Sequence, residues 1–253
     1  MAEANLPLNW LEQLRTHLDS LRAGGVLFVP QGHLLETRPR MLPTAPFEKL
    51  ELPIEPIERR RKELRLLATE VTQCQRCTEM YSTRTQTVFG IGPIDPEVAF
   101  VGEAPGADED RLGEPFVGRA GQLLTRIIQA CGFEREEVYI FNILKCRPPN
   151  NRTPTTAECA NCRPFFDRQF ELVKPKHLVA LGGTAAKTLI NTSTGITRLR
   201  GKVYEYRGIP LICTFHPSAL LRDESGRMKR DCWEDMKLLL RTMGRPIPNV
   251  KRS

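Results

Sequence analysis

The sequence predicts an α/β protein in which helices cover both faces of a mostly parallel sheet. Short apolar runs of strand length alternate with helical patterns from Val98 to about Met243. Most of these runs are apolar without interruption, which is typical of strands that are buried on both faces. Strands that alternate with helices favour parallel pairing through helical crossovers, and therefore three layers, α/β/α.

Five segments have strand patterns, and the last two are predicted to form a hairpin around Arg207 and Gly208. A helix from Thr155 to about Leu172 is predicted from its capping box, in which Glu158 follows Thr155 by three residues. The helical spacing of apolar residues predicts further helices over 58–72, 123–131, 184–190 and 229–243. The predicted strands are 98–101, 138–142, 177–181, 203–206 and 209–214.

The N-terminal part of the chain is predicted to be an extension of the main domain. Leucines three or four residues apart predict an amphipathic helix over residues 7–23, and six prolines from Pro30 to Pro56 predict a linker. Two roles fit this helix, binding to another protein and packing on the main domain, and the sequence leaves both open. The predicted organisation is an extension over 1–60, a main domain over 61–245 and a tail over 246–253.

Composition and charge indicate a soluble protein with a polyanionic partner. The 253 residues are 40% hydrophobic and 26% charged, and the net charge is +7. No run of 18 apolar residues occurs, so neither a membrane span nor a membrane partner is expected. The N-terminus lacks the basic start and apolar core of a secretory signal, so a cytoplasmic location is expected.

One stretch, Val98 to Leu124, concentrates the features of a ligand site. A predicted strand runs into a turn of small residues, Gly102 to Gly106, and this turn places backbone N–H groups at the carboxyl edge of the sheet. An acidic patch and the aromatic Phe116 follow in the same stretch. The turn has neither the G-x-G-x-x-G spacing nor a following Gly-Lys-Ser/Thr, so ATP and NAD are poor candidates for the ligand.

Eight cysteines without an export signal indicate a metal site or free thiols rather than disulfides. Cys74 and Cys77 are two residues apart, and so are Cys159 and Cys162, which suits a Cys₄ site for zinc or an iron–sulfur cluster. Cys146 is a fifth candidate, and spacing alone does not choose between it and Cys159. The cysteines that lie in apolar surroundings are expected in the core: Cys131, Cys213 and Cys232.

From Cys74 to about Lys237 the sequence resembles the family 4 uracil-DNA glycosylases, the iron–sulfur branch of that superfamily. The motifs that carry the resemblance occur in the order and at about the distances of the family. The resemblance implies a three-layer α/β/α fold with a central, mostly parallel four-stranded sheet, and residues 1–60 lie outside it. The motifs are Cys74-x-x-Cys77, VGEAPGADED, PFVGRAGQLL, VYIFNILKCRPPNNRTP, LGGTAA, ITRLRGKVYEYRGIP and FHPSALLR.

The resemblance implies a [4Fe–4S] cluster with a structural role. The third and fourth cluster ligands of the family match Cys146 and Cys162, which leaves Cys159 as a bystander. The implied ligand set is therefore Cys74, Cys77, Cys146 and Cys162.

The implied reaction is DNA repair by hydrolysis of the bond between uracil and deoxyribose, after the base has left the helix stack. Phe116 matches the aromatic that stacks on uracil, and Asn142 matches the amide that reads its edge. His216 would donate a hydrogen bond to uracil O2 as negative charge develops there. Backbone N–H groups from Gly102 to Gly106, including Ala104, would add contacts.

Two carboxylates are candidates for positioning the attacking water or stabilising the cationic sugar. They are Glu109 and Glu103, with Glu109 slightly preferred.

The expected partner is uracil-containing DNA, single- or double-stranded, bound by a monomeric protein. The segment Pro217–Arg222 matches the family loop that enters the minor groove, for which apolar side chains are suited. Three alternatives remain: a relative that is trapped covalently on DNA, a non-catalytic DNA-binding subunit, and a glycosylase for other deaminated bases. The residues expected at DNA are Ser218, Leu220, Leu221 and Arg222, with Arg198, Arg200, Lys202 and Arg227 at phosphates.

Overall fold

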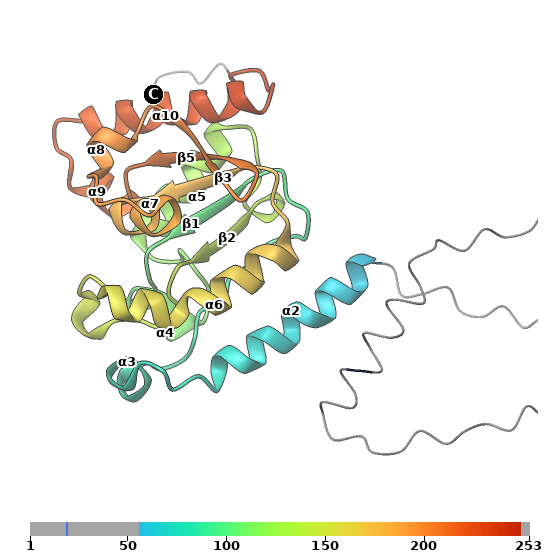
Figure 1. Ribbon diagram of the computed structural model, residues 1–253. Helices are drawn as coiled ribbons and strands as arrows, with labels where there is room; N and C mark the ends of the chain where they lie inside the picture. Colours follow the sequence, from blue (N-terminus) through green and yellow to red (C-terminus); the bar gives the residue numbers. More distant parts are fainter. Residues whose placement is uncertain (1–18, 20–55, 249–253) are drawn as a thin grey trace, which may run out of the picture. The chain divides into compact units, whose positions relative to one another are not determined.

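The computed structural model describes Asp19 and residues 56–248 (Figure 1). The helix predicted over residues 7–23 lies outside the described residues except for Asp19, and so does nearly all of the Pro-rich segment. No helix within the described part of the chain combines the length and apolar character that crossing a membrane requires.

The sheet has five strands in the order β2-β1-β3-β5-β4. Four of them run parallel, and β4 pairs antiparallel with β5 at the edge. The prediction of a mostly parallel sheet is confirmed, but the expected count of four strands is wrong, because the hairpin around Arg207 and Gly208 adds β4 to the sheet. The bounds are β1 Ala99–Gly102, β2 Tyr139–Asn142, β3 Leu178–Leu181, β4 Val203–Tyr206 and β5 Ile209–Thr214.

Helices cover both faces of the sheet, as the uninterrupted apolar runs predict (Figure 1). Phe100 on β1 belongs to the core formed with α5 (Arg119–Ala130) and α10 (Arg227–Thr242). The next residue, Val101, belongs to the core formed with α6 (Thr156–Val173) and α7 (Gly183–Ile190). Alternate residues of one buried strand therefore face the two helical layers.

The helix α2 (Pro56–Thr72) adds a further layer outside α6. Its buried residues, Leu67 and Val71, pack against Phe165 of α6. The predicted capping box of α6 is confirmed, since Thr155 Oγ1 accepts from Glu158 N and Glu158 Oε2 accepts from Thr155 N. The remaining short helices are α3 Thr78–Thr83, α4 Ala107–Leu112, η1 Arg135–Glu137, η2 Pro149–Asn151, α8 Ile196–Leu199 and α9 Pro217–Arg222.

The parallel strands bring distant segments of the sequence to one edge of the sheet. Gly102 at the end of β1 is paired with Asn142 at the end of β2. Leu181 at the end of β3 is paired with Thr214 at the end of β5, two residues before His216. The carboxyl edge of an open α/β sheet is where such folds bind ligands, so this register positions the site.

Candidate active site and cysteine cluster

A cleft of about 520 Å³ opens at the carboxyl edge of the sheet. It brings together most of the side chains that the sequence places at the substrate, from four different strand ends and the loops that follow them. Asn151, Arg152 and Thr153 also line the cleft, although the sequence reasoning assigned them no role; the only signal was their place in the RPPNNRTP motif. The predicted residues that line the cleft are Glu103, Ala104, Glu109, Phe116, Asn142, His216, Ser218 and Arg222.

Asn142 is 1% exposed, and its side-chain oxygen Oδ1 has no hydrogen-bond partner among the described residues. A buried acceptor without a donor costs about 1–3 kcal/mol, which a ligand N–H can recover. Gly102 lies directly behind this amide: a Cβ there would be 2.2 Å from Asn142 Oδ1 and 2.6 Å from Phe116 Cζ. The position therefore needs glycine if the amide and the ring are to keep their places.

The backbone of Phe116 is in the left-handed region, with φ of 55°, and its ring is 6% exposed. The ring lies beside the imidazole of His216, with centroids 5.6 Å apart and planes at 32°. Arg135 Nη2 donates to the carbonyl of Pro115 at 2.6 Å. Gly121 makes room for the turn, because a Cβ there would be 1.8 Å from the carbonyl oxygen of Phe116.

The two candidate carboxylates have different surroundings. Glu109 Oε1 accepts from the backbone N–H groups of Val117 and Gly118 at 3.0 and 3.1 Å. Its Oε2 accepts from Gly106 N at 3.1 Å, so both oxygens are engaged by the loops around the cleft. Glu103 also lines the cleft, and within residues 56–248 its side chain makes no hydrogen bond or ion pair.

The imidazole of His216 is held in one tautomer. Its Nδ1 accepts from Ser218 N at 3.1 Å and lies 2.8 Å from Ser218 Oγ. The ring proton is therefore on Nε2 when the imidazole is neutral. Burial, together with a smaller effect of the positive charge of Arg222, lowers the pKa of His216 to about 4. At neutral pH the site thus holds an uncharged imidazole whose free nitrogen is a donor.

The structure places the residues expected at DNA in different surroundings. Leu220 is 1% exposed and packs with Phe215 and Cys232, whereas Leu221 is 38% exposed. Arg200 forms ion pairs with Asp235 and Asp231 of α10. The remaining expected cations are exposed side chains: Arg198, Lys202, Arg222 and Arg227. The predicted loop after Pro217 is the short helix α9.

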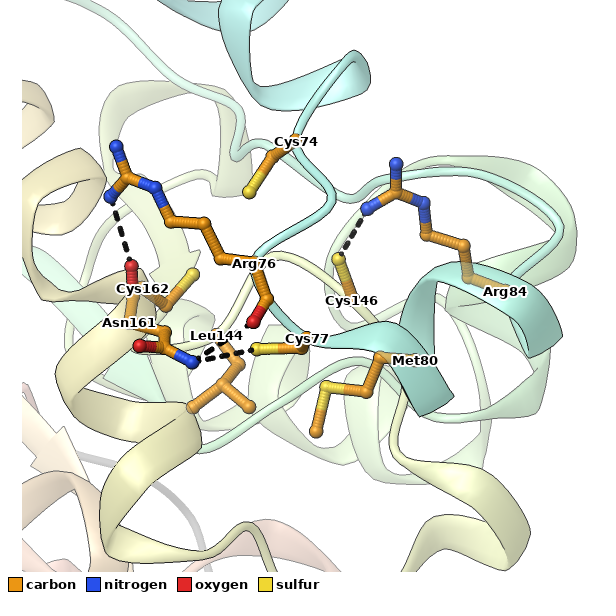
Figure 2. Close-up of a pocket in the computed structure, with 9 residues that line it drawn as sticks. All are labelled: Cys74, Arg76, Cys77, Met80, Arg84, Leu144, Cys146, Asn161 and Cys162. Atoms are coloured by element: carbon orange, nitrogen blue, oxygen red, sulfur yellow. Dashed lines mark hydrogen bonds between the residues drawn. The ribbon is translucent and has the colours of Figure 1, made fainter.

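Four thiols line a second, smaller cavity (Figure 2). They come from the turn after α2, the start of α3, the segment after β2 and the middle of α6. Arg84 Nη1 donates to Cys146 Sγ at 2.9 Å, and Asn161 Nδ2 donates to Cys77 Sγ at 3.7 Å. The four are Cys74, Cys77, Cys146 and Cys162, whereas Cys159 is outside this lining.

The four sulfur atoms lie around the cavity and do not converge on a single metal position. Among the described residues, no three His, Cys, Asp or Glu side chains are grouped to hold one metal ion. A [4Fe–4S] cluster attaches each of its four cysteines to a different iron and so takes thiols arranged around a space. The four thiols around this cavity, with N–H donors directed at two of them, fit a cluster of that kind.

The fold and the cleft define the class of protein: an α/β protein whose cleft at the carboxyl edge of the sheet presents an aromatic ring, an amide and a neutral imidazole. A family model described as the Uracil DNA glycosylase superfamily matches residues 89–237. The chain belongs to the uracil-DNA glycosylase superfamily, and its resemblance to the type-4 branch is confirmed by the relatives it matches.

Two of these relatives are type-4 uracil-DNA glycosylases. The one from Thermotoga maritima is 45% identical over 180 residues, which is 70% of this chain and 93% of the relative. The one from Archaeoglobus fulgidus is 40% identical over 192 residues, 73% of this chain and 95% of the relative. A type-5 uracil-DNA glycosylase from Pyrobaculum aerophilum is 31% identical over 182 residues, 59% of this chain and 80% of the relative. These two type-4 relatives are thus covered almost completely by this chain.

Proposed function

We propose that this protein is a monofunctional DNA-repair glycosylase that hydrolyses the bond between uracil and deoxyribose and leaves an abasic site. The observation that carries the proposal is the buried amide of Asn142, beside the rings of Phe116 and His216, because no donor among the described residues reaches its Oδ1. Uracil offers an N–H donor at N3 and an acceptor at O4. An amide matches both, whereas cytosine presents the opposite pair.

The base must leave the helix stack before the cleft can hold it. Phe116 then stacks on its face, and Asn142 reads its edge. As the glycosidic bond breaks, electrons move onto uracil and negative charge grows at O2. The Nε2–H of His216 donates to that oxygen, and a donor already in place before the charge appears is worth about 3–4 kcal/mol in comparable sites.

We assign to Glu103 the role of stabilising the cationic sugar and positioning the attacking water. The sequence had slightly favoured Glu109 for this role. The support is that Glu103 lines the cleft without a partner of its own among the described residues. Glu109 already accepts three backbone N–H groups. We therefore assign Glu109 to holding the loop that carries Phe116.

DNA is held by the rim of the cleft beside α9. Ser218 and Arg222 line the cleft, and Leu221 is the exposed apolar side chain that can enter the minor groove. Arg198, Lys202 and Arg227 are exposed cations for phosphates. Because such contacts release counterions, DNA affinity should fall steeply as the salt concentration rises.

The cofactor that suits the second cavity is a [4Fe–4S] cluster held by Cys74, Cys77, Cys146 and Cys162. The support is that these four thiols line one cavity and that Arg84 and Asn161 donate to two of the sulfurs. A bound cluster would supply a covalent link between segments that are far apart in the sequence. The residues of the cleft carry the chemistry described above.

An end-labelled oligonucleotide with one uracil tests the function. It is incubated with the protein single-stranded and paired to G or A, and half of each sample is treated with alkali before denaturing electrophoresis. Cleavage at uracil that depends on alkali is expected. A shifted band that survives denaturation would indicate covalent capture, and binding without either signal would indicate a non-catalytic subunit.

Asn142→Ala tests whether the buried amide reads the base, and Gln129→Ala is the matched control. Gln129 is an exposed carboxamide on α5, away from the cleft. Asn142→Ala should lose uracil release by about 100-fold or more and keep its iron–sulfur absorbance, because only the base reader is removed. Near-normal release by this variant would exclude Asn142 from the site.

A further inference from the structure

A buried lysine binds the backbone of the base-reading residue. Lys145 is 1% exposed, and its Nζ donates to the backbone oxygen of Asn142 at 2.8 Å and to Gln169 Oε1 at 2.5 Å. Within the described residues, no carboxylate forms an ion pair with it. Burying an amino group costs free energy unless hydrogen bonds compensate. A methionine would fill similar space without that cost, so the two hydrogen bonds of Lys145 need a reason.

Neighbouring side chains fix the position of this amino group. The rings of Phe89, Phe141 and Phe166 have their centroids 5.8, 5.2 and 5.8 Å from Nζ. Gln169 is fully buried, and its Nε2 donates to Phe89 O and to Tyr139 Oη, both at 2.9 Å. The amide of Gln169 is therefore oriented with its oxygen toward Lys145. The amino group of Lys145 is thus a fixed donor in the core.

The carbonyl that Lys145 binds is the last one of β2, which is an edge strand. Beyond one isolated bridge at Ile140, the described part of the chain provides no strand on the outer side of β2. On the inner side, Ile143 N donates to Gly102 O at 3.0 Å. Lys145 therefore gives Asn142 O the hydrogen bond that a neighbouring strand would otherwise donate. It thereby holds the end of β2, which carries the side-chain amide of Asn142.

We propose that Lys145 is a positioning residue for base recognition: by binding the carbonyl of Asn142 it holds the reading amide against the uracil edge. The inference rests on the proposed release of uracil. Groups that recognise a ligand must be held to within about 0.5 Å of their productive positions, and a strand end without hydrogen-bond partners does not provide this precision.

The test compares two DNA ligands that separate base reading from backbone binding. One carries 2′-fluoro-2′-deoxyuridine, which keeps uracil attached, and the other carries a tetrahydrofuran abasic site. The ratio of the two affinities measures base reading without chemistry. In Lys145→Met this ratio should fall about 10-fold and uracil release about 100-fold, while abasic-site affinity and iron–sulfur absorbance stay within about 2-fold of wild type. Lys176→Met, at an exposed lysine before β3, is the matched control and should change none of these.

A second variant covers the case in which Lys145→Met fails to fold or to retain iron. Gln169→Leu removes the partner of Lys145 on α6, away from the cysteine that follows Lys145, and should lower the same ratio by a smaller factor. An equal loss of affinity for both DNAs would indicate a merely structural role and overturn the inference. A wild-type preference for uracil that survives both substitutions would also overturn it. Wild-type protein without such a preference would overturn the proposed function as well.

Discussion

At the scale of residues, the site depends on how closely groups approach one another behind the cleft. Gly102 permits the amide of Asn142 and the ring of Phe116 to pack against the backbone of β1. His216 depends on its environment in a different way, since burial and Arg222 keep the imidazole neutral. Both features depend on single residues, and each leads to a measurement.

Gly102→Ala should abolish base reading while leaving most of the fold intact. The added Cβ would lie 2.2 Å from Asn142 Oδ1, so the amide and Phe116 must shift. We expect uracil release to fall by about 100-fold and the free energy of unfolding by about 1–3 kcal/mol. Gly195→Ala is the control, because no atom lies within 4 Å of a Cβ at that position. Equal kinetics for the two variants would contradict the close packing described here.

The pH dependence of uracil release reports on His216. Since its pKa is lowered to about 4 in the folded protein, against an ordinary value of 6.5, the imidazole stays neutral down to about pH 5. The unfolded chain binds the proton more readily between these values, so the contribution of His216 to stability is present above pH 6.5 and is lost as the pH falls toward 4. Chemical unfolding at several pH values should show this decline in the free energy of unfolding. In His216→Gln the part of the decline that comes from His216 should be absent. Loss of release with an apparent pKa near 6.5 in the wild-type protein would contradict the assignment.

At the scale of elements, one carboxylate joins the starts of two helices. Glu109 is the third residue of α4, and it accepts from Gly106 N at the N-cap of that helix. It also accepts from Gly118 N at the N-cap of α5. Phe116 lies between the two helices, so the position of the stacking ring depends on this link. Acidic side chains are favoured at helix N-termini, which accounts for a glutamate at this position.

The two glutamates should respond differently to the same substitution. Glu109→Gln replaces an acceptor with a donor facing backbone N–H groups, so we expect the free energy of unfolding to fall by about 1–3 kcal/mol together with activity. Glu103→Gln should reduce the turnover number by about 100-fold or more without changing thermal stability, because Glu103 has no partner to lose among the described residues. Thermal unfolding and single-turnover kinetics of both variants make the comparison. The reverse pattern would return the chemical role to Glu109.

At the scale of the whole molecule, the cysteine cavity joins segments that the sheet does not connect. Cys74 and Cys77 follow α2, Cys146 follows β2, and Cys162 lies on α6. Arg152 adds a second link near the cleft, since it pairs with Glu79 of α3 and with Glu158 of α6. Segments from the N-terminal helices and from the domain that contains the cleft therefore meet at this cavity.

Removal of one cluster thiol should affect the whole molecule. In Cys162→Ala we expect loss of the iron–sulfur absorbance and a lower unfolding temperature, because the link among α2, β2 and α6 is broken. Cys159→Ala, three residues away on the same helix and outside the cavity lining, should keep both. Iron content, visible absorbance and calorimetry provide the measurements. A Cys162→Ala protein with an intact cluster would remove Cys162 from the ligand set.

The sequence alone predicted the order of the elements well. Uninterrupted apolar runs such as Val98–Val101 mark strands because a strand buried on both faces has no polar side to show. The capping box of Thr155 and Glu158 marked the start of α6 correctly, because its hydrogen bonds are local. Even the motif residues Asn142 and His216 could be placed near each other, since parallel strands end at one edge.

Contacts between distant segments were beyond the sequence. Only the fold decides that both oxygens of Glu109 are engaged, that Arg200 is paired with α10, that Leu220 is buried and that the hairpin adds a fifth strand. The physical reason is that charge, exposure and hydrogen bonding depend on which groups meet in space, whereas periodicity and turn chemistry depend on neighbours along the chain. The sequence by itself therefore determined the elements and the family, and the tertiary structure decided which side chains are free to act.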